Sequence, residues 1–268
     1  MNYYIPKRLL SSGSDAKTVK GEKKGWVTYI MYMSPFTQNS IGVNVCSHAS
    51  AGCAAACLVG SGRGGFSNKV TRGRQNKTEF FLHNREGFLK KLYKELILIE
   101  KKHKGEKVAV RLNGTSDISW EKFKVKDNKN LFELFPSIQF YDYTKNHLRF
   151  DQKLPKNYSL VFSRSETNHD KAIELLNRGV SVAMVFDNIP KEFEGFKVIN
   201  GDETDLRFLD KKGVIVGLKY KVLTGKGANN NLAFDTWFAI RTKISQQVYF
   251  NKFEQINQKH RETYKNAA

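Results

Sequence analysis

All three cysteines of this 268-residue chain lie within twelve positions, in the segment NVCSHASAGCAAACL that begins at Asn44. Cys46, Cys53 and Cys57 follow the spacing C-x6-C-x3-C. Thiolates that converge on one point are soft ligands suited to iron–sulfur clusters and to zinc. The segment GCAAACL is rich in alanine, so we expect Cys53 and Cys57 to lie on one helical face, with Cys46 reaching them from the preceding loop.

A four-iron, four-sulfur (4Fe-4S) cluster is the cofactor that three clustered thiols favour. Three cysteines leave one iron without a protein thiolate, and that iron is free to bind a substrate or cofactor. Zinc is the alternative, with His48 as the further ligand of a Cys3His site. Structural or redox-active thiols are the remaining interpretation.

The net charge of +19 is concentrated at the two ends of the chain. Residues 1–107 contain 19 Lys and Arg against 7 Asp and Glu, and residues 219–268 contain 9 against 3. Such asymmetry attracts a polyanion and predicts a nucleic-acid partner, DNA or RNA, although a solubilising surface is the alternative. The side chains that we expect to contact nucleic acid are Arg72, Arg74, Lys219, Lys221 and Arg241.

The opening MNYYIPKRLL lacks the apolar run of a secretory signal, and no stretch approaches the roughly 20 apolar residues of a membrane span. An odd number of clustered cysteines also argues against a disulfide framework. We therefore expect the protein to work in a reducing cytoplasm, with no membrane partner.

Apolar, β-rich runs recur along the chain with helical segments between them. The first run is WVTYIMYM at 26–33, and the later ones are at 108–114, 138–143, 158–165, 180–187, 196–201 and 214–221. Residues 76–105 predict a long amphipathic helix or two. This alternation is typical of a mostly parallel α/β sheet or barrel.

We predict an α/β fold with three consecutive parts. A basic N-terminal segment, 1–25, precedes a partial or complete parallel β/α barrel over 26–221, which contains the cysteine loop at 44–66. A basic helical extension, 222–268, follows the barrel.

Polar side chains follow most of the predicted strands. In α/β sheets and barrels such residues meet at the carboxyl ends of the strands, where sites form. A Gly-rich loop, GSGRGGFSN, adds an arginine that could contact an anion. The residues that we expect to bind a cofactor or substrate are Arg63, Asn113, Asp117, Asp142, Arg164, Glu166 and Asp202. No motif assigns a catalytic role to any of them.

A cluster loop after the first strand of an α/β barrel resembles the radical S-adenosylmethionine superfamily. Its members bind a 4Fe-4S cluster through three cysteines, and the open iron chelates the methionine part of S-adenosylmethionine. The spacing here departs from that superfamily's C-x3-C-x2-C pattern, and Ala56 occupies the place of its aromatic residue. Asp117 in NGTSDISW is the nearest counterpart of the residues that meet the methionine amine.

A second resemblance covers most of the chain. The motifs CSHASAGCAAACL, GRGGFSN, VRLNGTSDISWE, FYDYTK, FSRSE, GDETDLRFLD and VIVGLK occur in this order. They are similar to a family of bacteriophage proteins usually labelled gene product 88-like, from about Gly25 to Lys221. The resemblance implies a phage origin, and hence the cytoplasm of an infected host cell, but it implies no particular reaction.

These observations favour a phage iron–sulfur protein on a radical-SAM-like barrel that binds nucleic acid, with a structural or redox-sensing cluster. The first alternative is a radical SAM-type enzyme that modifies a nucleic acid or nucleotide. The second is a zinc-stabilised nucleic-acid-binding module. The sequence leaves the oligomeric state open.

Overall fold

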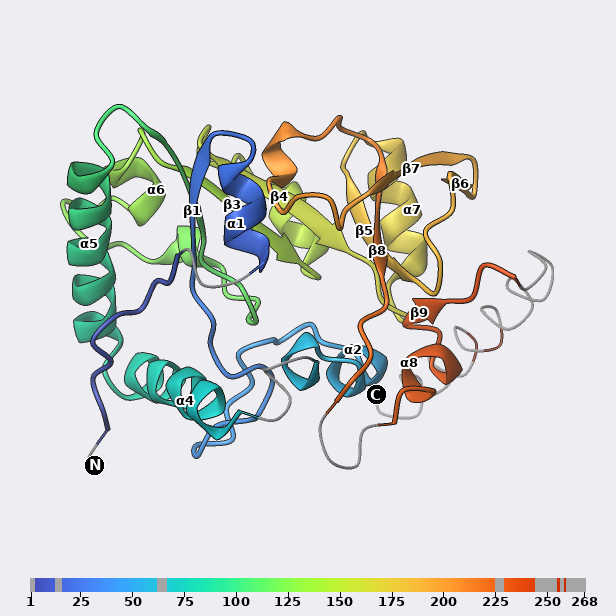
Figure 1. The fold of residues 1–268 in the computed structure, drawn as a ribbon, viewed down its shortest axis with the longest axis horizontal. Coiled ribbons are helices and arrows are strands. Elements are labelled where there is room, and N and C mark those ends of the chain that lie inside the picture. The colour runs from blue at the N-terminus through green and yellow to red at the C-terminus, as the bar shows by residue number, and fades with distance from the viewer. Residues whose placement is uncertain are drawn as a thin grey trace. The chain divides into compact units, whose positions relative to one another are not determined.

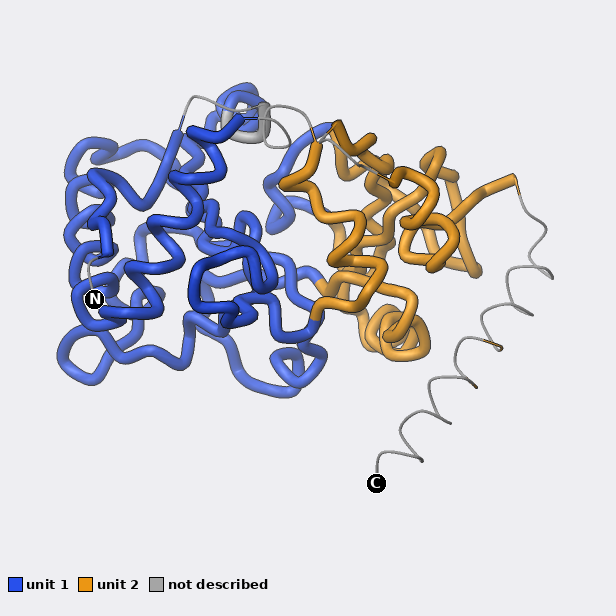
Figure 2. The backbone as a smooth tube through the Cα atoms, turned by 90° about the horizontal axis from the view of Figure 1, so that it is seen from below, with its two compact units in different colours: residues 1–48, 63–161, 203–210 blue, residues 49–62, 162–202, 211–268 orange. Residues whose placement is uncertain are grey.

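The computed structural model describes residues 3–12, 16–61, 67–224 and 229–243, together with the single positions 255 and 258. The chain forms two compact units, coloured separately in Figure 2. Unit 1 comprises residues 1–48, 63–161 and 203–210, and unit 2 comprises residues 49–62, 162–202 and 211–268. The two units interleave along the chain, so they divide it differently from the three consecutive parts expected from the sequence.

Nine strands form an open, mostly parallel sheet in the order β1-β2-β3-β4-β5-β8-β7-β6, and β9 also pairs with β5 (Figure 1). The strands are β1 Trp26–Ile30, β2 Lys107–Arg111, β3 Gln139–Thr144, β4 Tyr158–Ser163, β5 Val182–Phe186, β6 Glu192–Phe193, β7 Phe196–Asn200, β8 Ile215–Lys219 and β9 Ala239–Ile240. The predicted α/β class and the mostly parallel sheet are therefore confirmed.

A barrel is not formed by the strands that the structure describes. Strand β8 lies between β5 and β7, which interrupts the sequential order of a singly wound barrel. Strand β6 pairs antiparallel with β7 through a tight turn in which Glu194 and Gly195 adopt positive φ angles of 50° and 79°. This short hairpin ends the sheet, and β1 ends it on the other side.

The α-helices are α1 Ala16–Glu22, α2 Ala51–Ala55, α4 Asn68–His83, α5 Arg85–Lys102, α6 Leu131–Leu134, α7 His169–Asn177 and α8 Leu232–Asp235. The amphipathic segment predicted over 76–105 forms two helices rather than one. Asn84 ends α4 and caps α5, because its Oδ1 accepts a hydrogen bond from the backbone N–H of Gly87 at 2.8 Å. Within the described ranges, no helix is long and apolar enough to cross a membrane.

The core of unit 1 joins α4 and α5 to one face of its strands. Phe80 and Phe88 contribute from the helices, and Val110 and Phe140 contribute from β2 and β3. All four side chains are at most 2% exposed. Trp120 packs beside Phe88 with ring centroids 6.1 Å apart, so the loop after β2 is part of this core.

The helix predicted across the C-terminal segment is wrong over residues 236–243, whereas the single described positions 255 and 258 are helical. Helix α8 ends at Asp235, and Trp237 then adopts a left-handed φ of 66°. Residues Ala239 and Ile240 pair with Val185 and Phe186 of β5, so this part of the predicted extension completes the sheet of unit 2. The rest of the predicted helix, from residue 244, lies outside the described residues apart from two single positions.

Candidate functional site

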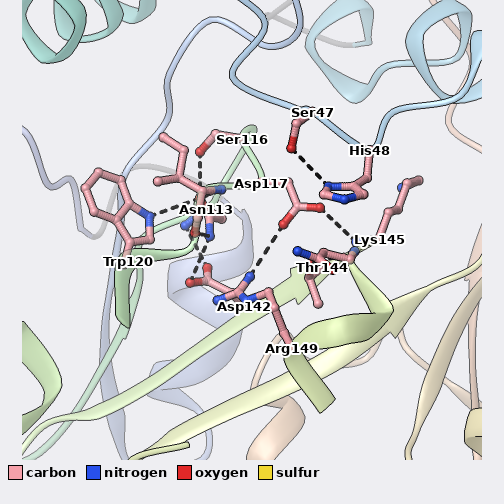
Figure 3. Close-up of polar contacts among 12 residues, drawn as sticks. Ser47, His48, Asn113, Ser116, Asp117, Trp120, Asp142, Thr144, Lys145 and Arg149 are labelled. Carbon is pink, nitrogen blue, oxygen red and sulfur yellow. Dashed lines mark hydrogen bonds and ion pairs between the residues drawn. The ribbon is translucent and has the colours of Figure 1, made fainter. Parts of the chain in front are cut away.

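Asn113 follows β2 and organises the loop that leaves this strand (Figure 3). Its Oδ1 accepts hydrogen bonds from Ser116 Oγ at 2.8 Å, Ile118 N at 3.0 Å and Trp120 Nε1 at 3.0 Å. Its Nδ2 donates to the carbonyl of Ile118 at 2.9 Å. Asn113 is 1% exposed, so this predicted site residue fixes the loop from inside the protein.

Asp142, in β3, is the buried partner of Asn113. Its carboxylate accepts hydrogen bonds from Asn113 N at 2.6 Å and from Tyr158 Oη at 2.9 Å. Burial raises the pKa of Asp142 to about 7, against the opposing effects of the Asn113 N–H and of the Arg111 and Arg149 charges. This carboxyl group therefore titrates near neutral pH although it is only 1% exposed.

The raised pKa of Asp142 predicts a pH-dependent stability. The folded-state pKa of about 7 lies above the ordinary value of 3.8, so between these values the folded state binds more protons than the unfolded state. The contribution of Asp142 to the free energy of unfolding should therefore fall as the pH rises from 4 to 7, by at most about 1.4 kcal/mol per pH unit. Urea unfolding of the wild type and of Asp142→Asn across this range should differ by that slope. An Asp142→Asn variant that keeps the full wild-type slope would contradict this assignment.

Arg149 neutralises two carboxylates beside this pair. Its Nε and Nη2 donate to the two carboxylate oxygens of Glu121 at 2.9 and 2.7 Å, and its Nη1 lies 3.5 Å from Asp117 Oδ1. Nη2 also donates to Tyr158 Oη at 2.7 Å. Asp117 Oδ2 accepts a hydrogen bond from Lys145 N at 2.8 Å. The structure thus brings together three of the predicted residues, Asn113, Asp117 and Asp142, and adds Arg149, which the sequence did not single out.

A cavity of about 350 Å³ lies against this network in unit 1. It is lined by residues from the segments 43–48, 81–85 and 117–123 and by Asn146. The segments 43–48 and 117–123 and the residue Asn146 come after β1, β2 and β3, and ligands of α/β proteins bind beyond the carboxyl ends of strands. We call it the β1–β3 cavity.

A second buried cluster forms around Arg111, the last residue of β2. Its Nη1 donates to both carboxylate oxygens of Asp205, at 3.2 and 3.0 Å, and its guanidinium lies 4.5 Å from the ring centroid of Tyr143. Tyr141 Oη donates to the same carboxylate at 3.2 Å. This cluster holds the segment 203–210 in unit 1. The signal that could have found it is a charged residue in the otherwise apolar run VAVRL.

Cys46 belongs to unit 1 and lies against the loop that Asn113 organises. Its Sγ accepts a hydrogen bond from Phe36 N at 3.5 Å and lies 3.6 Å from the carbonyl oxygen of Thr115, to which the thiol donates. His48 is exposed, and its Nδ1 lies 3.0 Å from Ser47 Oγ. Figure 3 shows His48 and Ser47 near Asp117.

Cys53 and Cys57 belong to unit 2, and the helical alignment predicted for them is wrong. Helix α2 ends at Ala55, and Cys57 has extended backbone angles, φ −61° and ψ 130°. No three His, Cys, Asp or Glu side chains within the described part of the chain form a group that could hold a metal ion. The iron–sulfur and zinc sites stay predictions.

Glu166 accepts hydrogen bonds from the N-terminal end of α2, the helix that contains Cys53. Its carboxylate accepts hydrogen bonds from Gly52 N and Ser50 Oγ, both at 2.7 Å, and Ser50 Oγ accepts one from Cys53 N at 3.1 Å. Gly52 is needed for this approach, since an added Cβ would lie 2.5 Å from Thr236 Oγ1 and 2.8 Å from Glu166 Oε1. Glu166 is thus placed to position Cys53.

Glu166→Ala should loosen this helix and make the Cys53 thiol more reactive. The change leaves the Gly52 N–H and the Ser50 hydroxyl without their acceptor, which costs about 1–3 kcal/mol for a buried donor. We expect alkylation of Cys53, followed by peptide mass spectrometry, to accelerate several-fold. The control is Glu192→Ala, at an exposed glutamate of the same unit. Equal alkylation rates in the two variants would show that Glu166 does not restrain the helix.

Arg164, predicted to bind a cofactor or substrate, instead donates hydrogen bonds to backbone carbonyls of unit 2. It is 1% exposed, and its Nη1 donates to the carbonyls of Trp237 and Phe238, the latter at 3.1 Å. Its Nε donates to Nδ1 of His169 at 3.3 Å, while His169 Nε2 lies 3.0 Å from Glu194.

Asp202 contacts two lysines, Lys219 and Lys221, in unit 2. Its carboxylate accepts a hydrogen bond from Lys219 N at 3.0 Å and lies 3.0 Å from Lys221 Nζ.

Two further predicted residues, Arg241 and Arg63, differ in what the structure describes of them. Arg241 Nη2 lies 3.6 Å from Asp235 Oδ1, and Arg241 Cζ lies 5.0 Å from the ring centroid of Phe234. Arg63 lies outside the described residues.

The two α4 residues predicted to contact nucleic acid, Arg72 and Arg74, differ in exposure. Arg72 is exposed and lines a surface hollow of about 450 Å³, whereas Arg74 is half-buried. The other lining residues of this hollow are Asn68, Thr71, Gln75, Asn76 and Glu79, all on α4.

The fold and these clusters define an α/β protein with an open, mostly parallel sheet and a polar network at strand ends in unit 1. The chain belongs to the gene product 88 family, whose model matches residues 8–235. Comparisons with curated proteins and with solved structures found no match. The phage gene-product family is therefore confirmed, and nothing in the comparisons supports the resemblance to the radical S-adenosylmethionine superfamily.

Proposed function

We propose that this protein binds nucleic acid and that the N-terminal part of α4 supplies the contact surface. The observation that supports this most strongly is the composition of residues 68–77, NKVTRGRQNK, which contain four basic residues and no acidic one. The buried residues of α4 are Thr78, Phe80 and Phe81, all after this segment. Val70 is the one apolar side chain of this segment and it is exposed, so the first two turns of α4 bury little apolar surface and present mostly polar side chains to solvent.

The hollow on α4 has the side chains that nucleic-acid recognition uses. Its residues recur at spacings of three and four, so they share one helical face. Asn, Gln and Arg side chains hydrogen-bond to base edges, and Thr and Arg side chains bind phosphates. Lys69, exposed beside this face, adds a further cation. A face of this kind suits a nucleic acid better than an acidic protein, for which charge alone would suffice.

Helix α5 carries further basic side chains of unit 1. Together α4 and α5 contain ten Lys and Arg residues against four Glu residues. Lys90, Lys94, Lys101 and Lys102 of α5 are exposed. Cations spread over two helices favour contacts with several successive phosphates, which give sequence-independent affinity.

Fluorescence anisotropy with labelled 20-nucleotide single- and double-stranded DNA and RNA tests this function. Binding should weaken steeply between about 50 and 200 mM salt, with log K falling by about 0.9 per phosphate contact on duplex DNA for each unit of log salt. Polyglutamate of similar charge is the matched competitor. Absence of binding at 50 mM salt, or displacement by polyglutamate as efficient as by unlabelled DNA, would refute the proposal.

The 4Fe-4S cluster is a separate proposal supported by the spacing of the three thiols. Cys46, Cys53 and Cys57 would hold it, and it would act structurally or as a redox sensor. Anaerobic purification should give about four irons and four sulfides per chain, lost in Cys53→Ala. Stoichiometric zinc would indicate a zinc site in place of the cluster, and absence of any metal would refute both the iron–sulfur and the zinc site. If four irons are found, the iron without a protein thiolate justifies a test for S-adenosylmethionine cleavage, measured as formation of 5′-deoxyadenosine.

A further inference from the structure

We propose that the β1–β3 cavity of unit 1 binds a small phosphate monoester whose body includes a planar ring, with a nucleoside monophosphate as the representative. This inference goes beyond nucleic-acid binding by α4. It rests on a different set of side chains, at the ends of the strands.

The size and position of the cavity suit a small molecule. Its volume of about 350 Å³ falls within the range of about 300–1,000 Å³ for ligand pockets. The segments 43–48 and 117–123 form two of its walls, and a backbone hydrogen bond from Asp117 N to the carbonyl of Val45, at 3.0 Å, joins them. Asn113 and Arg149 hold the segment 117–123 through their contacts with Ile118 and Asp117. The cavity is thus preorganised, which lowers the entropic cost of binding.

The charge of the cavity selects an anion. Arg85 and Lys122 both line it, and neither forms an ion pair with any residue that the structure describes. The one acidic residue in the lining, Asp117, is already satisfied by Arg149 and by the Lys145 N–H. A guanidinium can bind a phosphate with two parallel hydrogen bonds, and an ammonium adds a second positive charge.

The guanidinium of Arg85 lies against two aromatic rings. Its Cζ lies 5.0 Å from the ring centroid of Phe81 and 5.4 Å from that of Phe123. Two aromatic rings therefore orient a flat cation at the cavity wall, and such a cation also offers a plane on which a base can stack.

The remaining lining indicates the body of the ligand. Apolar contacts come from Val45, Leu82 and Ile118, which inorganic phosphate alone would leave uncovered. Ser119 and Asn146 provide a hydroxyl and an amide for the polar edges of a sugar or base. The same phosphate monoester occurs on a free mononucleotide and at the 5′ end of a nucleic-acid strand, and the experiment below distinguishes these sources.

Isothermal titration calorimetry of the full chain with AMP, adenosine, inorganic phosphate and benzoate tests the proposal. AMP should bind at least 10-fold more tightly than the other three ligands. Arg85→Gln and Lys122→Gln should each weaken AMP binding about 10-fold, while Arg85→Lys should retain part of it. Lys124→Gln is the matched control, because Lys124 lies outside the lining and pairs with Glu133 at 3.6 Å.

Each further outcome decides the proposal. If a 5′-phosphorylated 12-mer binds with the same dependence on Arg85 and its 5′-hydroxyl counterpart does not, the site takes strand ends, and the phosphate-monoester chemistry stands. AMP that binds no better than adenosine, or equally in wild type and both Gln variants, would overturn it. Thermal unfolding of each variant verifies that folding is intact, and AMP binding that survives neutralisation of α4 separates this site from the nucleic-acid surface.

Discussion

Arg149→Met should lower the free energy of unfolding of unit 1 by about 3–5 kcal/mol, the cost of removing one partner from a buried ion pair. Arg149 is 1% exposed and donates to Glu121 and to Tyr158 Oη. Its loss leaves the Glu121 and Asp117 carboxylates, with side chains 9% and 12% exposed, without their cation. Urea denaturation followed by circular dichroism measures this change.

Two further variants make this prediction specific. Glu121→Gln added to Arg149→Met should recover part of the loss, because it removes one of the unpaired charges. Lys124→Met, which breaks an exposed pair of the same unit, should cost less than about 1 kcal/mol. An Arg149→Met variant no less stable than Lys124→Met would show that the network does not hold the loop after β2.

Neutralising α4 should weaken nucleic-acid binding by about 100-fold or more. Each lost phosphate contact lowers the salt slope by about 0.9, so loss of three makes the slope shallower by about 2 to 3 units. The variant combines Lys69→Gln, Arg72→Gln and Arg74→Gln, all within the first seven residues of the helix. Anisotropy titrations at several salt concentrations measure both the affinity and the slope.

A variant of equal net charge controls for charge alone. It combines Lys129→Gln, Lys153→Gln and Lys156→Gln, at three exposed lysines of unit 1 outside α4 and α5. We expect this variant to retain nearly all of the affinity. Equal losses in the two triple variants would mean that the protein attracts polyanions through its overall charge and that α4 has no special part.

Local pattern predicted much of the fold because most strands are short apolar runs and the helices between them are amphipathic. The complete barrel was wrong, because closure depends on the order in which strands pair and apolar periodicity does not encode that β8 lies between β5 and β7. Over residues 236–243 the predicted C-terminal helix was wrong for a related reason. Ala239 and Ile240 gain a pairing partner in β5, and this tertiary contact outweighs helix propensity.

The candidate site was predicted in part. Polar residues after β2 and in β3 did gather, as the rule on strand ends implies. Their partners could not be found from spacing, because Arg149 lies 32 residues from Asp117 and Tyr158 lies 16 from Asp142. In the cysteine segment, alanine content predicted a helix through Cys57, but the helix ends at Ala55. Pattern indicates which residues are polar and buried, whereas the contacts they make depend on the fold.

Amide hydrogen exchange with and without a nucleic-acid oligonucleotide is the most direct test of the central claim that α4 binds nucleic acid. We predict that saturating oligonucleotide at low salt slows exchange in residues 68–79 and that the α4 triple variant loses this effect. Protection confined to other segments, with exchange in residues 68–79 unchanged in the wild type, would contradict the account.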